Sequence, residues 1–355
     1  EIKIEVRATG LNFRDVLNAL GMYPGPPMPF GMECAGEIVE VGDGVDDFQV
    51  GQQVMALASG SLASHVNVPT GVATLSPVGM SACQAATIPT SFITAYHALY
   101  SLAGLSKGER VLIHAGTGGL GMAAIQLAKV VGAEIFATAG SPEKRDLLVS
   151  LGVHHVMDSR SLDFADEIQQ FTHAKGVDVV LNSLTGDFLR RSLDSLATGG
   201  RFIEVGKMEI FDDEFIAENY PGISYNFFDL DKLGREQTDY IQDVFNDLKD
   251  LFSNGSLEPL PLQTFSIFES VKAFRYMQQA RHVGKVVLTP PATIRVEGTY
   301  LITGGAGALG LQVASHFSKN SAGALILANR REPSDAVREQ AALIEARGTR
   351  VVFVS

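Results

Sequence analysis

A glycine-rich segment follows an apolar run and has the spacing of a phosphate-binding turn. The run Val111–His114 is typical of a buried strand, and a helical pattern begins near Leu120. Glycines here would permit a tight turn, close approach of the backbone to a pyrophosphate, and close packing of helix on strand. The helix N-terminus would offer free N–H groups to the phosphates. The segment predicts a dinucleotide site, with a turn that only packs as the alternative; its candidate residues are Gly116, Thr117, Gly118, Gly119, Leu120 and Gly121.

The residues after the next apolar run indicate which dinucleotide would bind. The run Glu134–Ala139 is followed by Ser141, Lys144 and Arg145, and no carboxylate stands at its end. Sites for NAD usually place an acidic residue there to hold the ribose 2′-hydroxyl. A hydroxyl and two cations favour the 2′-phosphate of NADP(H) instead, because phosphate recruits Lys and Arg. We expect Ser141 and Lys144 to contact that phosphate; the alternative is that Lys144 and Arg145 are a solvated helix start.

Lys207 and Asp229 are the candidates for proton transfer. Lys207 follows the run 201–206, at the carboxyl end of an expected strand, where ligands bind in an open parallel sheet. A lysine there can donate a proton or stabilise an oxyanion; the alternative is an ordinary exposed lysine. Asp229 lies in the apolar run 225–230, which should bury it, and it could pair with Lys207 and orient the amine. A surface acid or a helix cap is the alternative for Asp229, and Asp231 is its rival.

The elements that must position these residues change character along the chain. Residues 1–90 contain short β-type runs separated by Gly and Pro, which predict a small barrel or sandwich. A helix is expected at 94–102, and strands then alternate with helices. The alternation predicts a parallel sheet with helices on both faces. The expected strands are 110–114, 134–138, 178–182 and 201–205, and the expected helices are 120–131, 143–151 and 187–196.

The last part of the chain returns to other patterns. Residues 260–290 are extended and then helical, and Pro290-Pro291 is typical of a linker. A second strand–glycine–helix unit begins at Gly298, and the apolar run 351–355 predicts a buried strand at the end. The chain begins in an alternating polar and apolar run without an initiator Met. We therefore expect a piece of a longer polypeptide.

Composition argues against several function classes. The 355 residues include 40 acidic and 28 basic side chains, and a net charge of -12 disfavours nucleic acid as a partner. Two cysteines, Cys34 and Cys83, are too few for a disulfide framework and suit a reducing compartment, so we expect a cytoplasmic protein. The eight histidines are scattered, and no metal site is expected. No apolar run reaches the roughly 18–20 residues of a membrane span, so no membrane partner is expected.

Several segments occur in a characteristic order along the chain: Leu11–Leu17, Ala19–Gly25, Gly31–Gly36, His114–Ala124, Val177–Leu184, Gly200–Lys207 and Gly284–Leu288. Together they resemble the enoyl reductase domains of modular type I polyketide synthases, in the zinc-free branch of the medium-chain dehydrogenase/reductase superfamily. The resemblance covers residues 1 to about 290. Residues 298–310 resemble the start of a polyketide synthase ketoreductase, but no Tyr-x-x-x-Lys pair follows, so we expect this part to be catalytically silent.

The resemblance implies a fold and a reaction. The fold class would be α/β, with a GroES-like β-barrel substrate domain and an inserted NADPH-binding Rossmann parallel-sheet domain. The barrel would comprise residues 1–90 and 258–290, the Rossmann domain 91–257, and a truncated ketoreductase fragment 298–355 would add a partial second Rossmann βαβ unit. The implied reaction is NADPH-dependent reduction of a trans-2-enoyl thioester on an acyl carrier protein, with hydride to Cβ and a proton to Cα. The implied partners are that carrier protein and neighbouring synthase domains, the ketoreductase among them.

The motifs also imply roles for single residues. The family has a Lys/Asp pair proposed to protonate Cα, and Lys207 and Asp229 match it. Tyr23 stands where a tyrosine accompanies protonation on the face that gives a 2S methyl branch, and a phenol can act as an acid; the alternative is simple packing. A polar residue in the family faces the nicotinamide or substrate, and another lies near the nicotinamide ribose. The cofactor contacts implied by the matched motifs are Asn12, Asn182, Gly206 and Lys285.

Other functions fit the same residues. A stand-alone quinone or enone reductase would use the same cofactor site, but the ketoreductase-like start at Gly298 argues against it. Hydride-initiated ring closure, with loss of a γ leaving group, shares the hydride transfer step. A catalytically silent structural module of a multienzyme is the non-enzyme alternative. The intact glycine turn and the retained Lys207 and Asp229 argue against that module.

Overall fold

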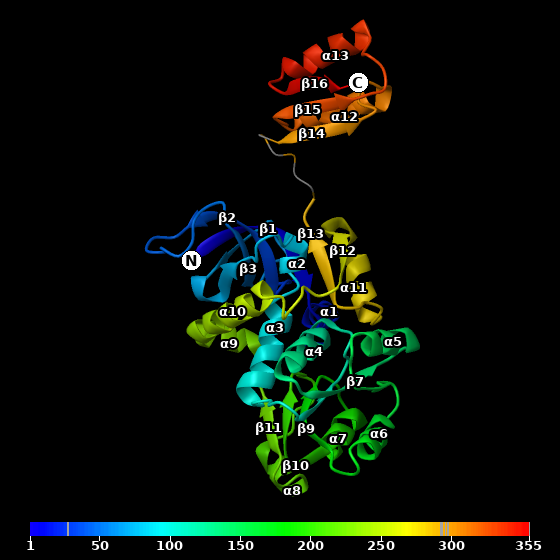
Figure 1. Cartoon of the computed structure of the whole chain (residues 1–355). Helices are drawn as coiled ribbons and strands as arrows, with labels where there is room; N and C mark the ends of the chain where they lie inside the picture. The colour runs from blue at the N-terminus through cyan, green and yellow to red at the C-terminus, as the bar shows by residue number, and fades with distance from the viewer. Residues whose placement is uncertain (27, 292–293, 295, 297, 355) are drawn as a thin grey trace. The chain divides into compact units, whose positions relative to one another are not determined.

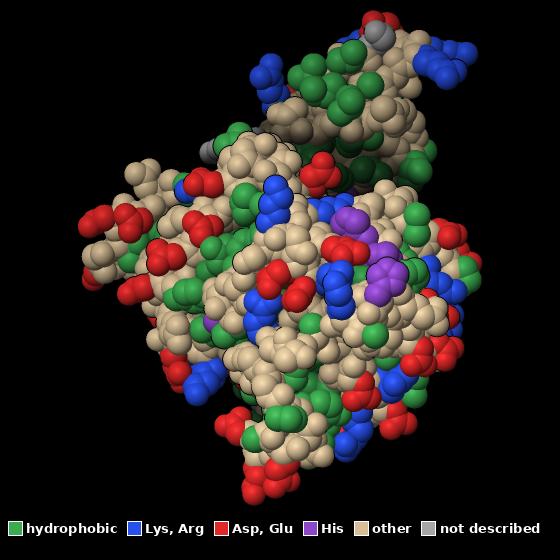
Figure 2. All heavy atoms as spheres, turned by 60° about the horizontal axis from the view of Figure 1, so that its bottom comes forward, with side chains coloured by type: hydrophobic (Ala, Val, Ile, Leu, Met, Phe, Trp, Pro, Cys, Tyr) green, Lys and Arg blue, Asp and Glu red, His purple; other side chains and the backbone are tan. Residues whose placement is uncertain are grey.

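The computed structural model describes residues 1–26, 28–291, 294, 296 and 298–354. The chain forms two compact units, Glu1–Pro290 and Pro291–Ser355, and each is described by itself (Figure 1). No helix in the described ranges combines the length and the apolar character needed to cross a bilayer. Figure 2 shows Asp and Glu side chains at many places on one face, with Lys and Arg between them, in keeping with the net charge of -12.

Strands from both ends of the first unit share one mostly antiparallel sheet. β1 (Ile2–Leu11) begins with alternating buried and half-buried side chains, because apolar and polar residues alternate in its sequence. On its two sides β1 pairs with β2 (Glu33–Val41) and with β13 (Lys285–Thr289), which lies beside it in Figure 1. The strand order is β12-β13-β1-β2-β3-β5, where the strands not yet given are β3 (Gln53–Leu57), β5 (Ala73–Leu75) and β12 (Leu262–Ser266). A further strand, β4 (His65–Val68), lies off this path and pairs with β1.

The second sheet has six parallel strands in the order β11-β10-β9-β6-β7-β8. Successive residues of its central strand enter different cores: Val111 and Ile113 join one apolar cluster, and Leu112 joins another. Both faces are therefore covered, as a parallel sheet requires. The strands are β6 (Arg110–Ile113), β7 (Glu134–Ala139), β8 (His155–Asp158), β9 (Val177–Asn182), β10 (Leu196–Glu204) and β11 (Ser224–Phe227). The helices between them are α4 (Gly119–Val131), α5 (Pro142–Ser150), α6 (Phe164–Phe171), α7 (Asp187–Asp194) and α8 (Asp213–Asn219).

The remaining helices pack around the two sheets. The helix expected at 94–102 begins earlier, at Pro89, where proline suits a first helical turn, and its last six residues form a π-helix. One apolar cluster contains residues of both sheets, including Ile4, Phe92 and Ile135, so the two sheets share a core. These helices are α1 (Phe13–Ala19), α2 (Ala82–Ala85), α3 (Pro89–Tyr96), the π-helix η2 (His97–Leu102), α9 (Leu230–Glu236), α10 (Thr238–Ser253) and α11 (Ser270–Gln278), with 3-10 turns η1 (Thr70–Val72) and η3 (Ile267–Glu269).

The second unit is a small three-stranded parallel sheet in the order β14-β15-β16. The C-terminal strand forms as expected, but its side chains are half-buried or exposed, because β15 is its single neighbour among the strands that the structure describes; Ser355 lies outside the described residues. Together the two units confirm the predicted α/β fold class, with its barrel-type sheet, its parallel sheet and a partial second βαβ unit. The elements here are β14 (Thr299–Thr303), α12 (Ala308–Lys319), β15 (Ala324–Ala328), α13 (Asp335–Glu345) and β16 (Arg350–Val354).

Candidate active site

Three side chains from distant segments meet beyond the carboxyl edge of the parallel sheet. Lys207, shortly after β10, donates a hydrogen bond from Nζ to the Tyr23 hydroxyl at 2.7 Å and forms an ion pair with the Asp229 carboxylate. Asp229 follows β11, the neighbour of β10, whereas Tyr23 comes from the segment between α1 and β2 of the other sheet. The structure thus brings together the three residues predicted for proton transfer.

Local contacts orient this group. Asp229 is the N-cap of α9: its Oδ1 accepts the N–H of Asp231 at 2.9 Å, while Oδ2 faces Lys207. The two interpretations of Asp229, helix cap and lysine partner, therefore both hold. The Tyr23 ring lies beside two cations, with the Arg14 guanidinium carbon 4.8 Å and Lys207 Nζ 5.4 Å from its centroid.

The charge of Asp229 is maintained by its partners. Burial would raise the pKa of this carboxyl, but the hydrogen bond and charge of Lys207 and the N–H of Asp231 outweigh it and lower the pKa. Asp229 is therefore ionised at neutral pH and can hold the amine of Lys207 in one direction. The Lys207 and Asp229 side chains are 21% and 31% exposed, so a substrate can reach them.

Asp231, the rival for the role of Asp229, points to arginines. Its Oδ2 lies 3.8 Å from Nη2 of Arg14 and forms an ion pair with Arg235, one helical turn later. These contacts distinguish two acids that stand only two positions apart in the sequence. The structure selects Asp229 as the partner of Lys207.

The glycine-rich segment forms the turn between β6 and α4, and Gly118 is the N-cap of the helix. A Cβ on Gly121 would lie 2.5 Å from the Ala115 carbonyl oxygen and 2.7 Å from the Cα of Gly116, so the close approach of helix and strand requires glycine. The left-handed residue of the turn is Ala115, with φ 49°, rather than one of the glycines. The first N–H groups of α4 have no partners within the helix, as an anion site requires.

The far end of the first unit packs directly on this turn. Thr117 is buried and its carbonyl accepts the N–H of Gly284 at 2.8 Å. A Cβ on Gly119 would lie 2.7 Å from Cδ of Lys285 and 2.9 Å from Oγ of Ser91. The turn is therefore backed by α3 and by the start of β13. Leu120, the remaining candidate of the segment, packs against the shared apolar core.

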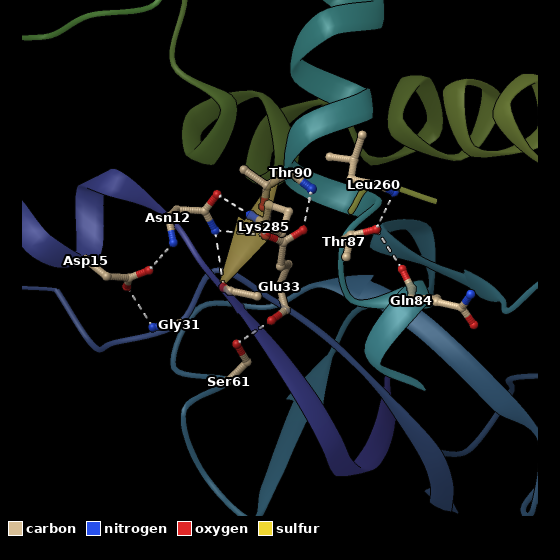
Figure 3. Close-up of polar contacts among 11 residues, drawn as sticks. Asn12, Asp15, Gly31, Glu33, Ser61, Gln84, Thr87, Thr90, Leu260 and Lys285 are labelled. Carbon is tan, nitrogen blue, oxygen red and sulfur yellow. Dashed lines mark hydrogen bonds and ion pairs between the residues drawn. The ribbon is translucent and has the colours of Figure 1, made fainter. Parts of the chain in front are cut away.

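Behind the turn lies a group that we call the buried polar cluster: Asn12, Glu33, Thr90 and Lys285 (Figure 3). Lys285 Nζ donates to Glu33 Oε1 at 2.5 Å and to Asn12 Oδ1 at 2.9 Å. The Asn12 amide donates to Glu33 Oε1 at 2.9 Å, and the Thr90 N–H donates to Glu33 Oε2 at 2.8 Å. Lys285 is 3% exposed and Glu33 is fully buried. Asn12 and Lys285, both predicted as cofactor contacts, thus bond to each other and to the same oxygen of Glu33, a glutamate that the sequence analysis did not single out.

Ser141 and Lys144 lie at the end of β7, where a 2′-phosphate was predicted. Ser141 caps α5, since its Oγ accepts the N–H of Lys144 at 3.4 Å. The Lys144 Nζ donates to the carbonyls of Ala280 at 2.8 Å and His282 at 2.7 Å. Burial, and then the charge of Arg160, lower the pKa of Lys144. An ammonium has three donors, so one remains for a ligand.

Arg160 is a further cation at this place that the sequence analysis missed. A Cβ on Gly140 would lie 3.1 Å from Nε of Arg160. Within the described residues, no side-chain hydrogen bond or ion pair engages the Arg160 guanidinium, whereas Arg145 is paired with Asp158 at 2.9 Å. The available signal was the position of Arg160 just after β8, a short strand that the sequence pattern did not predict.

Asn182 and Gly206, the other predicted cofactor contacts, both bond to Glu204. Asn182 is fully buried at the end of β9, and its amide donates to Glu204 Oε2 at 2.6 Å. The Gly206 N–H donates to Glu204 Oε1 at 2.6 Å. Glu204 was not singled out from the sequence, although it stands inside a matched motif.

Three family models match successive parts of the chain. A model described as an alcohol dehydrogenase GroES-like domain matches residues 1–95, and one described as a zinc-binding dehydrogenase matches residues 119–223. A model described as a KR domain matches residues 298–355. These matches follow the barrel-type sheet, the parallel sheet and the second unit.

The residues present do not fit the zinc ion that the second description implies. No group of three or more His, Cys, Asp or Glu side chains within the described residues is placed to hold a metal. Cys34 is buried, and burial raises the pKa of its thiol to about 12, which disfavours the thiolate that zinc binds. No step proposed below uses a metal.

Curated relatives are large polyketide synthases. A type I phenolphthiocerol synthesis polyketide synthase of Mycobacterium marinum is 44% identical over 362 residues, which cover 100% of this chain and 17% of that protein. The pikromycin polyketide synthase component PikAII of Streptomyces venezuelae is 45% identical over 318 residues, which cover 89% of this chain and 8% of that protein. The chain therefore spans less than a fifth of the length of these two relatives.

Solved structures give the same result. The CurK enoyl reductase is 46% identical with a TM-score of 0.78, covering 82% of this chain and 91% of that one. The CurF ER cyclopropanase of the curacin A pathway is 38% identical with the same TM-score and coverage. Escherichia coli quinone oxidoreductase, complexed with NADPH, is 26% identical with a TM-score of 0.75, covering 81% and 91%. The chain belongs to the enoyl reductase domains of modular polyketide synthases, within the medium-chain dehydrogenase/reductase oxidoreductases, and continues into the first part of a ketoreductase domain.

Proposed function

We propose that the first unit is an NADPH-dependent enoyl reductase that saturates a trans-2-enoyl thioester carried by an acyl carrier protein during polyketide chain elongation. The observation that carries this proposal is the Lys207 amine, held between Asp229 and Tyr23 just past the carboxyl edge of the parallel sheet. Membership in the enoyl reductase family supports it. The carrier protein and a neighbouring ketoreductase domain are the proposed partners, since the relatives are synthases and residues 298–355 match a KR domain.

The reaction needs a hydride at Cβ and a proton at Cα. NADPH, when bound, supplies the hydride. Negative charge then develops on the thioester oxygen, and the protein must stabilise the enolate and deliver a proton. Lys207 is the proton donor to Cα, and Asp229 fixes the direction of its amine. The Tyr23 hydroxyl accepts a hydrogen bond from the same amine and is a second group that can supply a proton. For a 2-methyl substrate, Tyr23 would bias the face on which the proton arrives.

The cofactor would lie on the glycine turn, with its phosphates at the N-terminus of α4. The residues available for a 2′-phosphate are Ser141, Lys144 and Arg160 at the ends of β7 and β8. The nearby acid, Asp158, is paired with Arg145 rather than free to hold a ribose hydroxyl. We therefore propose selection of NADPH over NADH. The likeness to a quinone oxidoreductase complexed with NADPH supports this choice.

The test is turnover of a crotonyl or 2-methylcrotonyl thioester with NADPH, followed at about 340 nm, with NADH as the cofactor control. Lys207→Met should lower kcat by about 100-fold or more, the contribution of a positioned acid, while the Kd for NADPH stays unchanged. The matched control is Lys232→Met on α9, a lysine that is 65% exposed and should leave kcat within about twofold.

Each outcome has a meaning. Tight NADPH binding with no turnover of any enoyl thioester would support a silent structural module instead. Equal use of NADH would refute the proposed 2′-phosphate site. Unchanged kcat in the Lys207 variant would refute the assignment of the proton donor while leaving the reductase assignment in place.

A second candidate is hydride-initiated ring closure with loss of a γ leaving group. It is favoured by one observation, the likeness to a solved cyclopropanase with the same fold. Product mass separates the two: reduction adds two hydrogens and keeps the γ substituent, whereas ring closure adds one hydrogen, delivered as hydride to Cβ, and loses the leaving group, because the enolate carbon bonds to Cγ instead of taking a proton. Simple reduction is the first choice, because the Lys207, Asp229 and Tyr23 contacts provide a donor for Cα.

A further inference from the structure

Glu204 is the last residue of β10, between β9 and β11, and the proposed reaction does not use it. Its side chain is completely buried. One carboxylate oxygen, Oε1, accepts the N–H of Gly206 at 2.6 Å, and the other, Oε2, accepts a side-chain N–H of Asn182 at 2.6 Å. A buried carboxyl is costly unless its oxygens have partners, and here both do.

Asn182 is held just as completely. Its amide nitrogen also donates to the Leu184 carbonyl at 2.9 Å, and its amide oxygen accepts the Leu184 N–H at 3.2 Å. Its backbone carbonyl accepts the N–H of Val205 at 3.0 Å. The side chain of Asn182 is therefore a fixed point at the end of β9, and Glu204 connects the turn after β10 to it.

Lys207 directly follows Gly206, the residue whose N–H donates to Glu204. A Cβ on Gly206 would lie 2.7 Å from Glu204 Oε1, so the carboxylate is folded against the backbone of the turn. We propose that Glu204 is a positioning residue: by holding the Gly206 N–H against the end of β9, it fixes the direction in which the chain presents the Lys207 amine. This inference rests on the proposed function, because it explains how that function's proton donor is aimed.

The surroundings of Glu204 make its hold on the turn depend on pH. Burial raises the pKa of Glu204 to about 8, although hydrogen bonds from Asn182, Gly206 and Val205 lower it; the nearby charge of Glu209 adds to the rise. The carboxylate accepts one N–H group on each oxygen. When the carboxyl is protonated, one oxygen carries a hydrogen and accepts the N–H of Asn182 or Gly206 less well. The turn is therefore held best above the pKa.

Tyr225, on β11, is a further titratable group close to Glu204. Burial, and then the charge of Glu204, raise the pKa of Tyr225 to about 12, so it stays neutral in the range where Glu204 titrates. Glu209, whose charge acts on both Glu204 and Tyr225, accepts the N–H of Gly186 at 2.7 Å with its carboxylate. We therefore expect kcat of the unmodified chain to rise with pH through about 8.

The experiment compares Glu204→Gln with Glu209→Gln, a matched loss of a neighbouring carboxylate. The first readout is independent of turnover: lysine is incorporated with ¹³C at Cε, and the NMR resonance of Lys207 Cε, assigned by its absence in Lys207→Arg, is followed with pH. Glu204→Gln should shift this resonance and abolish its change near pH 8, whereas Glu209→Gln should keep the change and lower its midpoint, because one nearby negative charge is lost. The second readout is kinetic: Glu204→Gln should lower kcat about 10-fold or more and remove the rise with pH, with KM for NADPH changed less than about threefold.

Two results would overturn the inference. One is a folded Glu204→Gln variant whose Lys207 resonance and kcat profile match the unmodified chain. The other applies if the glutamine variant does not fold: Glu204→Asp keeps the charge but shortens the reach, so an Asp variant with an unmoved Lys207 resonance would refute positioning. Failure of the proposed function, by contrast, would appear as absent turnover in the unmodified chain and would leave the NMR comparison interpretable.

Discussion

Removing the Lys285 amine should destabilise the first unit far more than removing a surface charge. Lys285→Met keeps the length of the side chain but leaves the carboxylate of Glu33, which is fully buried, with only the N–H donors of Asn12 and Thr90. Breaking a buried ion pair from one side costs about 3–5 kcal/mol, because the remaining charge is uncompensated. At roughly 2–4 °C per kcal/mol, the midpoint of thermal unfolding should fall by about 6–20 °C.

The assay is denaturant unfolding, followed by circular dichroism because the chain has no tryptophan. Glu33→Gln, Lys285→Met and the double variant complete a cycle. The double variant buries no charge, so its loss of unfolding free energy should be smaller than the sum of the single losses by about 2 kcal/mol or more. Lys272→Met is the control: this lysine is 71% exposed in a surface pair, and its loss should stay within about 0.5 kcal/mol. The reasoning would be refuted if the loss of unfolding free energy in the double variant equalled the sum of the two single losses. It would also be refuted if Lys285→Met lost no more unfolding free energy than Lys272→Met.

Three further predictions concern the cofactor site and the core. Arg160→Ala should raise KM for NADPH about 10-fold with little effect on KM for NADH, because only NADPH carries the 2′-phosphate; equal effects in steady-state assays would contradict this. Gly121→Ala should cost about 1–3 kcal/mol of unfolding free energy and weaken NADPH binding by fluorescence titration, since its Cβ would lie 2.5 Å from the Ala115 carbonyl oxygen. Burial lowers the pKa of His114 to about 3, so between about pH 6.5 and pH 3 the unfolded chain binds a proton that the folded chain does not. The free energy of unfolding should therefore decrease as the pH is lowered through this range, by up to about 1.4 kcal/mol per pH unit. In urea unfolding at pH 7, 5.5 and 4.5, His114→Gln should lose stability less steeply, and an unchanged slope would contradict the assignment.

The parallel sheet was predictable because its signals are local. β6, β7 and β9 are short runs rich in apolar β-type residues, as is the second part of β10 from residue 201, whereas its first part contains two glycines and was not predicted. The glycine turn after β6 has the spacing typical of a dinucleotide site. The missed elements lack such runs. β8 is four residues long and contains a half-buried histidine, His155, so its periodicity is weak, and Arg160 after it went unnoticed.

The longest helix was missed for a different reason. α10 buries Ile241, Val244, Phe245 and Leu248, the i, i+3, i+4, i+7 spacing of an amphipathic helix. The apolar spacing over residues 238–253 is by itself sufficient to predict this helix, whereas the matched motifs end at Lys207 and resume at Gly284, so they give no signal for it.

The sequence predicts that Lys207 pairs with an acid near residue 230, but it does not decide between Asp229 and Asp231. That an acid near residue 230 would meet Lys207 was predicted from the apolar run around Asp229 and from the Lys/Asp pair of the resembling family, without the strand β11 that positions it. Which acid meets it depends on where α9 begins and on Arg14, more than two hundred residues away, which engages Asp231. Long-range contacts of this kind have no local signature.

The buried polar cluster shows why the prediction for Lys285 needs a different kind of test from the prediction for Lys144. Residues 12 and 285, separated by 273 positions, hydrogen-bond directly because β1 and β13 are neighbours in one sheet. The stem of Lys285 lies against Gly119 of the cofactor turn, while its amine faces Glu33. A change at Lys285 must therefore alter the support of the turn and the stability of the sheet together, whereas a change at Lys144 removes hydrogen bonds to the Ala280 and His282 carbonyls at a half-exposed place and leaves no buried charge unpaired. Loss of NADPH binding in a Lys285 variant is thus evidence for a direct contact only if the stability of that variant is restored by Glu33→Gln and the binding is not.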